Sequence, residues 1–356
     1  MLTVRALAVR NIRNLRAIDF EPGPRLNVLS GDNGQGKTNI IESIYLAATS
    51  RSFRTPNLKE VVLRGEREGS VRLTVEDYVQ SVGLRGGMRQ LRIGEKRPDS
   101  IVAYAAKTPV VAFSPTEIVL SMGPGKERRK LLDRIALYTA PAAAEEAMRY
   151  TRSLKNRQRA LEGRGAKASD LDAWEELVVR HGIETMRSRS ESSARLASAA
   201  RDVFAEIGAT DLVLGATYVP SAPEDALAYA SLLRATREID ARRKSASSGP
   251  HRDDLVLTLG GTPVRGYASQ GQHRAIVLAL KAAELSIVAE ARRVRPVLLL
   301  DDVSSELDRS RATALMAFLD KQQGQVFVTT TRPELIETSP TGRMDFWVRE
   351  GQIGLT

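Results

Sequence analysis

The sequence contains no cysteine, and this absence excludes a disulfide framework and a thiolate metal site. No apolar run approaches the roughly 18 residues of a membrane span, so contact with a membrane would need a partner, and none is expected. A recognisable signal peptide is also lacking. Together these absences predict a cytoplasmic protein.

Positive charge is what the sequence has in excess, with a formal net charge of +10 and a pI of about 9.9. Such an excess favours polyanionic partners such as nucleic acid or anionic lipid, but a basic surface that serves solubility has the same signature. The 356 residues, 42% of them hydrophobic and 27% charged, suffice for about two globular domains. Composition alone therefore leaves the function open.

One stretch near the N-terminus matches the phosphate-binding loop pattern. It lies between an apolar run at 26–29 and a helical apolar pattern at 40–46, and it consists of Gly31, Asp32, Asn33, Gly34, Gln35, Gly36, Lys37 and Thr38. Glycines allow backbone N–H groups to turn into such a loop, and the following helix offers its positive end. Lys37 can reach the outer phosphates and the Thr38 hydroxyl can hold magnesium. The loop predicts nucleotide binding and no particular function.

Short alternating apolar runs surround this loop. Residues 2–9 and 18–20 predict a hairpin, and the runs between residues 61 and 93 predict an antiparallel meander. The apolar run at 109–113 predicts a buried strand that returns to the nucleotide-binding core. This half of the chain is therefore expected to combine a core sheet with an antiparallel one.

From about residue 116 the apolar spacing becomes helical. It predicts an antiparallel hairpin of two helices, the first through 147–161 and the second from about 171 to 207. His181 on the second helix is expected to pack and not to bind a metal, because no other ligand stands at metal-binding spacing. A strand at 212–218 and a helix over 226–244 follow.

The chain is expected to cross back to the first domain at 245–250, where Ser, Gly and Pro are concentrated. We therefore predict a discontinuous nucleotide-binding head formed by residues 1–115 and 247–356. Residues 116–246 form the mainly helical second domain of this prediction.

A second motif begins a long helical pattern at 274–293. It comprises Ser269, Gln270, Gly271 and Gln272. A Ser and a Gly at a helix start can form another anion site through backbone N–H groups and the helix dipole. Taken alone this indication is weak, since Ser at this position is most often only a cap.

A third motif is the apolar run at 297–300 that ends in Asp301 and Asp302. It predicts a buried parallel strand whose carboxyl end, where α/β sheets bind ligands, delivers two acid groups. Asp301 can share a magnesium ion with Thr38, and Asp302 can orient or deprotonate water. A capping or solvated aspartate is the other interpretation of Asp302.

A fourth motif, a turn at 305–308, follows the two acid groups and consists of Ser305, Glu306, Leu307 and Asp308. Taken together and in this order, the four motifs resemble those of the ABC-type ATPases. Asn33 and Asn39 are similar to the SMC/Rad50-like branch of that class. The segments 11–14, 51–54 and 249–254 are also similar to the bacterial RecF family. The resemblance to this family therefore covers nearly the whole chain.

The resemblance implies an α/β fold with an ABC-type P-loop ATPase head, in which a mixed sheet and an antiparallel β meander carry an inserted α-helical lobe without a long coiled coil. It implies ATP and Mg²⁺ as cofactors, with Lys37 and Asp302 catalytic and with Thr38 and Asp301 as metal ligands. Arg13 and Asn39 join the loop residues as nucleotide contacts. The residues expected to act in trans from a second subunit are Ser269, Gln270, Gly271 and Gln272.

The same resemblance implies an ATP-induced homodimer that grips duplex or gapped DNA and hydrolyses ATP slowly to release it. Such a weak, DNA-dependent ATPase acts as a switch in recombinational repair, is associated with the nucleoid, and helps RecO and RecR to load RecA.

Two departures from the ABC pattern concern the residues that would carry out ATP hydrolysis. Asp302 replaces the usual Glu, and neither a glutamine after 110–113 nor a histidine after Val328 is found.

Three other functions remain open at this level. A transporter ATPase subunit shares the fold but needs only about two thirds of this length. A long-armed SMC clamp requires hundreds of coiled-coil residues, which the interval between the first two motifs does not supply. A small-molecule P-loop kinase explains the first motif and none of the others.

Overall fold

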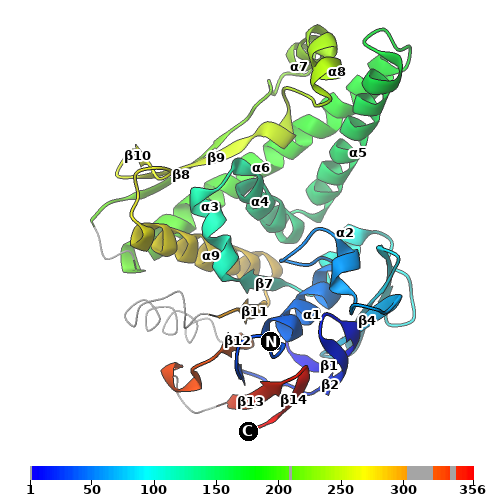
Figure 1. Cartoon of the computed structure of the whole chain (residues 1–356). Coiled ribbons are helices and arrows are strands. Elements are labelled where there is room, and N and C mark those ends of the chain that lie inside the picture. The colour runs from blue at the N-terminus through cyan, green and yellow to red at the C-terminus, as the bar shows by residue number, and fades with distance from the viewer. Residues whose placement is uncertain (1, 208–210, 303–323, 337–341) are drawn as a thin grey trace. The chain divides into compact units, whose positions relative to one another are not determined.

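The computed structural model describes residues 2–207, 211–302, 324–336 and 342–356. Figure 1 shows the chain, whose blue N-terminal and red C-terminal segments belong to the same compact unit. This unit 1 comprises Met1–Glu117 and Val288–Thr356, and unit 2 comprises Ile118–Ile287. We describe each unit by itself.

The two units differ from the predicted domains at the second boundary, where the chain returns from the helical part to the nucleotide-binding part. The prediction places residues 247–287 in the nucleotide-binding half, whereas the structure packs them within unit 2. The reason is that the strand β9 (Asp254–Leu259) pairs antiparallel with β8 (Leu214–Val219) along its whole length. The chain therefore leaves unit 2 only within the helix α9 (Gln270–Arg292).

The core of unit 1 is a mixed six-stranded sheet. Its strands, in spatial order, are β14 (Gln352–Leu355), β13 (Arg343–Arg349), β3 (Leu26–Ser30), β12 (Val326–Thr330), β11 (Val297–Leu300) and β7 (Val110–Phe113). All neighbours are parallel except the antiparallel pair of β13 and β14. The mixed sheet and the returning strand at 110–113 are thus confirmed.

A second, antiparallel sheet completes unit 1. Its spatial order is β2 (Leu15–Phe20), β1 (Val4–Ile12), β4 (Glu68–Val75), β5 (Tyr78–Arg85) and β6 (Met88–Ile93). Side chains alternate between buried and less buried positions along β4, as expected for a strand with one buried face, whereas β1 has an irregularity in its register between Val4 and Ala6. The predicted hairpin and meander are therefore one continuous sheet.

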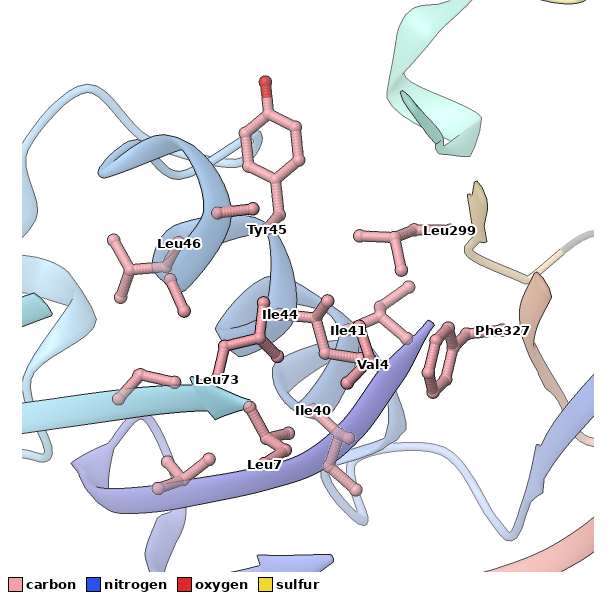
Figure 2. Close-up of a cluster of buried hydrophobic side chains, with 14 of the residues drawn as sticks. Val4, Leu7, Ile40, Ile41, Ile44, Tyr45, Leu46, Leu73, Leu299 and Phe327 are labelled. Carbon is pink, nitrogen blue, oxygen red and sulfur yellow. The ribbon is translucent and has the colours of Figure 1, made fainter. Parts of the chain in front are cut away.

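Helix α1 (Lys37–Thr49) packs against both sheets of unit 1. Ile40, Ile41 and Ile44 of this helix meet Leu7 and Leu73 of the antiparallel sheet in Figure 2. Leu299 and Phe327 of the mixed sheet close the same cluster from the other side. A helix with apolar side chains on most of its circumference is stable only when buried in this way. The helix that begins at the phosphate loop is consequently held rigidly.

Unit 2 is mainly helical and contains one small sheet. The helices α5 (Pro141–Arg164) and α6 (Leu171–Ile207) form the predicted hairpin, with α4 (Gly125–Thr139) packed against both. The sheet has the order β10 (Thr262–Pro263), β9, β8. His181 is buried with its Nδ1 on Glu146 Oε2, so it packs against the neighbouring helix of the hairpin.

The predicted helix over 226–244 is wrong in one respect, because it is two helices, α7 (Ala226–Ala235) and α8 (Arg237–Arg243). The break follows from a buried side chain. Arg157 is fully buried and its Nη2 donates to the carbonyl of Leu233 at 2.9 Å. That carbonyl then has a partner outside the helix, and the Thr236 hydroxyl donates to the carbonyl of Leu232 at 3.0 Å. Such side-chain hydrogen bonds compete with the regular helix.

The other elements of the described residues are short helical segments: η1 (Leu58–Val61), α2 (Ile101–Ala105), η2 (Pro115–Ile118), α3 (Val119–Met122), η3 (Pro250–Arg252) and η4 (Pro333–Leu335). Within the described ranges, none of the helices combines the length and the apolar composition that crossing a bilayer requires.

We expect Gln325→Leu to lower the stability of unit 1 strongly. The Gln325 side chain is fully buried, accepts from Val4 N at 2.8 Å and donates to the carbonyls of Val4 and Gly23 at 3.0 and 2.8 Å. Leucine would leave these backbone groups unpaired, at a cost of about 2–4 kcal/mol. Thermal denaturation measures the loss, with the exposed Gln352→Leu as control. Equal midpoints for both variants would contradict the assignment.

Candidate nucleotide-binding site

The phosphate loop of residues 31–38 has a backbone that only glycine allows at its turning points. Gly31, Gly34 and Gly36 have φ values of 151°, 79° and 117°. A Cβ atom at Gly31 would lie 2.3 Å from the carbonyl oxygen of Val348 on β13. The loop is therefore pressed against the neighbouring strand at its first glycine.

The far side of the loop is braced by the C-terminal hairpin. Gly351 N donates to the carbonyl of Gln35 at 2.8 Å, and Glu350 N donates to Gln35 Oε1 at 2.7 Å. The strands β13 and β14 were not among the predicted elements. Gln35 thereby acts as a support of the loop, and Asp32 and Asn33 remain exposed at its tip.

Helix α1 begins at the end of the loop with an open N-terminus. Its N-cap, Gly36, supplies no side-chain acceptor, so the first N–H groups of the helix are available to an anion. Lys37 Nζ donates to the carbonyls of Gly31 and Asp32 at 2.6 and 2.7 Å and so spans the loop. The ammonium is held where an anion in the loop would meet it.

Burial lowers the pKa of Lys37, and the carboxylates of Asp302, Asp301 and Asp32 oppose this effect. The ammonium thus lies in a partly desolvated place with acid groups nearby. In such a place its charge acts on a phosphate more strongly than it would in water.

Asp301 is the acid group that contacts the loop helix. Its Oδ1 accepts from the Thr38 hydroxyl at 2.7 Å and from the Thr329 hydroxyl, also at 2.7 Å. Burial raises the pKa of Asp301, and the two hydroxyl donors oppose the rise. Thr38 and Asp301, which we predicted to share a magnesium ion, are therefore in direct hydrogen-bond contact, and the shared ion stays a prediction.

Asp302 stands beside this pair with a left-handed backbone, φ 47°. Its N–H donates to the Thr329 hydroxyl at 2.9 Å. Thr329 consequently holds both acid positions, although it was not among the predicted site residues. The signal was the sheet register: Leu300 is paired with Val328, which sets Thr329 beside Asp301.

The oxygen donors present fit a magnesium ion that arrives with a nucleotide. Mg²⁺ prefers one or two protein oxygens and takes its other ligands from phosphates and water. Thr38 and Asp301 supply one hydroxyl and one carboxylate at adjacent positions. Among the described residues, no three acidic, histidine or cysteine side chains form a metal cluster of their own. The site is thus suited to a shared ion and not to a resident one.

A network of polar side chains surrounds the outer face of the loop. Asn39 Nδ2 donates to Asn14 Oδ1 at 2.7 Å, and Asn14 Nδ2 donates to the carbonyl of Gln35 at 3.2 Å. Arg54 Nη1 donates to Asn39 Oδ1 at 2.8 Å. Asn39 is therefore linked to the loop through Asn14.

Glu42 organises the adjoining part of this network. Its buried carboxylate accepts from the Arg13 Nε and Nη2 atoms at 2.9 and 2.8 Å, and from the Ser52 hydroxyl. Arg13 Nη1 also donates to the carbonyl of Glu60 at 2.8 Å. The structure thus places the guanidinium of Arg13, which we predicted as a nucleotide contact, on protein acceptors. Its contact with a nucleotide stays a prediction.

The second motif lies in unit 2 and forms a reciprocal cap at the start of α9. Ser269 N donates to Gln272 Oε1 at 2.8 Å, and Gln272 N donates to the Ser269 hydroxyl at 3.2 Å. Ser269 and Gln270 are exposed, and Gly271 follows in the first turn. The turn predicted at 305–308 lies outside the described residues.

The fold and this site define the class of ABC-type P-loop ATPase heads. Residues 3–347 match the family model described as RecF/RecN/SMC N terminal domain. The DNA replication and repair protein RecF of Myxococcus xanthus (strain DK1622) is 38% identical over 346 residues, 93% of this chain and 91% of that protein. The RecF of Geobacter sp. (strain M21) is 35% identical over 362 residues, 98% of each. The chain belongs to the RecF family.

Solved structures agree with this membership. One described as the recombination mediator protein RecF-ATPrS in RecFOR pathway has a TM-score of 0.88 at 27% identity and covers 99% of this chain and 98% of its own. An Smc head domain from Pyrococcus furiosus has a TM-score of 0.57 at 13% identity, which shows the common fold alone. The predicted fold class is confirmed.

We expect Thr329→Val to weaken Mg²⁺-dependent binding of a fluorescent ATP analogue by roughly tenfold. Valine keeps the shape of threonine but removes the hydroxyl that orients Asp301, and loss of such a supporting bond typically costs 10- to 100-fold. Titration with and without Mg²⁺ measures the effect. Thr330→Val is the control, because its hydroxyl accepts from Arg332 N. A tenfold loss in the control alone would disprove the role of Thr329.

Proposed function

We propose that this chain is an ATP-binding and slowly hydrolysing ATPase that acts as a switch in recombinational DNA repair. The observation that carries the proposal is the bond between Thr38 and Asp301, which joins the phosphate loop to the acid-tipped strand. A solved structure described as RecF-ATP, 28% identical with a TM-score of 0.88, supports ATP as the nucleotide.

Each residue of the site has a role in this proposal. The N–H groups at the start of α1 and the Lys37 ammonium bind the phosphates, whose negative charge they balance. Thr38 and Asp301 would hold Mg²⁺, which supplies charge neutralisation on the phosphates when bound. Asp302 orients water or takes a proton from it. Its side chain is a methylene shorter than the usual Glu, which favours slow turnover.

The second half of the nucleotide site is proposed to come from another copy of the chain. Ser269, Gln270, Gly271 and Gln272 present an exposed helix start, and helix starts attract phosphates. In the ATP-bound dimer, this turn of each copy would face the nucleotide held by the loop of the other. Nucleotide binding then controls whether two copies associate.

DNA is the proposed polyanion of this basic chain. Arginine and lysine side chains would contact phosphates of duplex or gapped DNA without reading bases, and hydrolysis would end the grip. RecR and RecO are the proposed protein partners, with RecA loading as the outcome and the cytoplasm, at the nucleoid, as the location.

We expect Lys37→Met to reduce ATP affinity by about 10- to 150-fold, the equivalent of a charge-assisted hydrogen bond of 1.5–3 kcal/mol. Isothermal titration measures the affinity directly. Lys126→Met, on exposed helix surface of unit 2, serves as the control. Unchanged affinity in Lys37→Met would remove the loop from the nucleotide site.

Ser269→Arg is expected to abolish ATP-dependent dimerisation while ATP binding persists, because a bulky side chain would occupy the position proposed for the partner's phosphates. Since this change also removes the helix cap, Ser269→Asp provides a second variant that keeps a capping acceptor and repels phosphate. Sedimentation velocity with and without ATP measures association, with the exposed Ser190→Arg as control. Normal dimers of both Ser269 variants would refute action in trans.

A further inference from the structure

Unit 1 contains a cationic hollow that the nucleotide site does not use. It lies between the segment that follows α1 and the turn from β5 to β6, and its volume is about 670 Å³. The charged side chains that line it are Arg51, Lys59 and Arg89. Met88, Gly86 and Gly87 also belong to the lining. We call it the Arg51–Lys59–Arg89 hollow.

Glycine at the β5–β6 turn is what makes this hollow possible. Arg85 pairs with Met88 across a two-residue turn in which Gly86 and Gly87 have φ values of 60° and 85°. A Cβ atom at Gly87 would lie 3.0 Å from Cγ and Cε of Lys59. The aliphatic stem of Lys59 therefore lies along the bare backbone, and the Lys59 side chain lines the hollow.

Arg89 is fixed from one side only. Its Nη1 donates to the carbonyl of Ser50 at 2.9 Å, at the C-terminal end of α1, where a cation is favourable. The Arg89 Nε and Nη2 atoms make no hydrogen bond to any residue that the structure describes. These donors remain available to an acceptor in the hollow, and a guanidinium suits two oxygens of one phosphate.

The charges of the hollow are not balanced by the protein. Across the ranges that the structure describes, none of Arg51, Lys59 and Arg89 forms an ion pair with a carboxylate. Burial lowers the pKa of Arg89, and the neighbouring guanidinium of Arg51 lowers it further. Like charges that face each other without a counterion are a cost which a bound anion would relieve.

A neighbouring hollow provides a useful contrast. It has a volume of about 1050 Å³ and is also lined by Arg89, but Glu95 and Asp99 share its wall with Arg92 and Arg97. Its positive charge is thus largely compensated from within. Of these two hollows, the smaller one combines three cations with a lining that contains no carboxylate.

We propose that the Arg51–Lys59–Arg89 hollow binds a phosphodiester group of the DNA backbone. The identity of the ligand as DNA rests on the function proposed above, whereas the anionic character of the ligand follows from the hollow itself. Met88, 74% exposed at the tip of the turn, provides an apolar contact for the adjoining sugar. Contacts of this kind fix DNA in place without reading its sequence.

The experiment measures binding of a fluorescently labelled duplex to the full chain with ATP by anisotropy over a range of salt concentrations. We expect Arg89→Gln and Lys59→Gln each to weaken binding about 5- to 30-fold and to reduce the steepness of the salt dependence by about one counterion. Arg89→Lys keeps the charge and should retain the salt slope. The matched control is Arg72→Gln on β4, an exposed arginine of the same sheet, with an expected change below about twofold.

The possible outcomes separate the two proposals. If the unaltered chain does not bind the duplex, the proposed DNA-binding function fails. If it binds and both glutamine variants keep its affinity and salt slope, the hollow is not the DNA site. Thermal denaturation identifies folded variants, and Lys59→Gln tests the hollow should Arg89→Gln not fold.

Inorganic phosphate provides the remaining arm of the experiment. Suppose that phosphate raises the denaturation midpoint of the unaltered chain but not that of Arg89→Gln, while both chains bind DNA with the same affinity. The hollow would then be a site for small anions, and the proposal would be overturned. Competition between phosphate and the duplex, lost in Arg89→Gln, would support it.

Discussion

The hydrogen bond from Thr38 to Asp301 is the interaction on which the rest of the site depends. It joins two positions 263 residues apart in the chain, the first turn of α1 and the end of β11. Parallel pairing of β11 with β12 brings the Thr329 hydroxyl to the same carboxylate oxygen. Three segments thus converge on one buried acid group, which no single segment could hold in place. Its position is set by sheet register and not by local sequence.

The phosphate loop has a similar dependence on distant parts of the chain. Its first glycine is packed against the carbonyl of Val348, and Gln35 is held by backbone N–H groups of the last hairpin. The glycine pattern provides the conformational freedom, but β13 and β14 select the conformation. The same motif in another fold would lack the contacts with β13 and β14. The motif alone therefore predicts that the loop binds a nucleotide, but it does not predict what holds the loop in one conformation.

The sequence predicted those features that depend on residues close together in the chain. The loop, the acid-tipped strand and the helical hairpin are confirmed because apolar spacing and glycine positions specify them locally. The contacts of Thr329 with the acid pair and the break at Thr236 were missed because each depends on a partner from a distant segment, namely Asp301 and Arg157. The second boundary between the units differs for the same reason, since the pairing of β8 with β9 is not visible in either strand alone.

The two phosphate sites proposed for unit 1 lie at opposite ends of α1 and differ chemically. At the start of α1 the donors are backbone N–H groups and one lysine, arranged for a compact and highly charged nucleotide. Past its end, Arg51 in the following segment, Lys59 on η1 and Arg89 on β6 are proposed to suit the spaced phosphates of a polymer. The segment that follows α1 is bound back to this helix, because the Ser52 hydroxyl donates to Glu42 and Arg54 donates to Asn39. Asn39 is linked in turn to the nucleotide loop through Asn14, so any coupling between the two proposed sites would pass through this network and would be reciprocal.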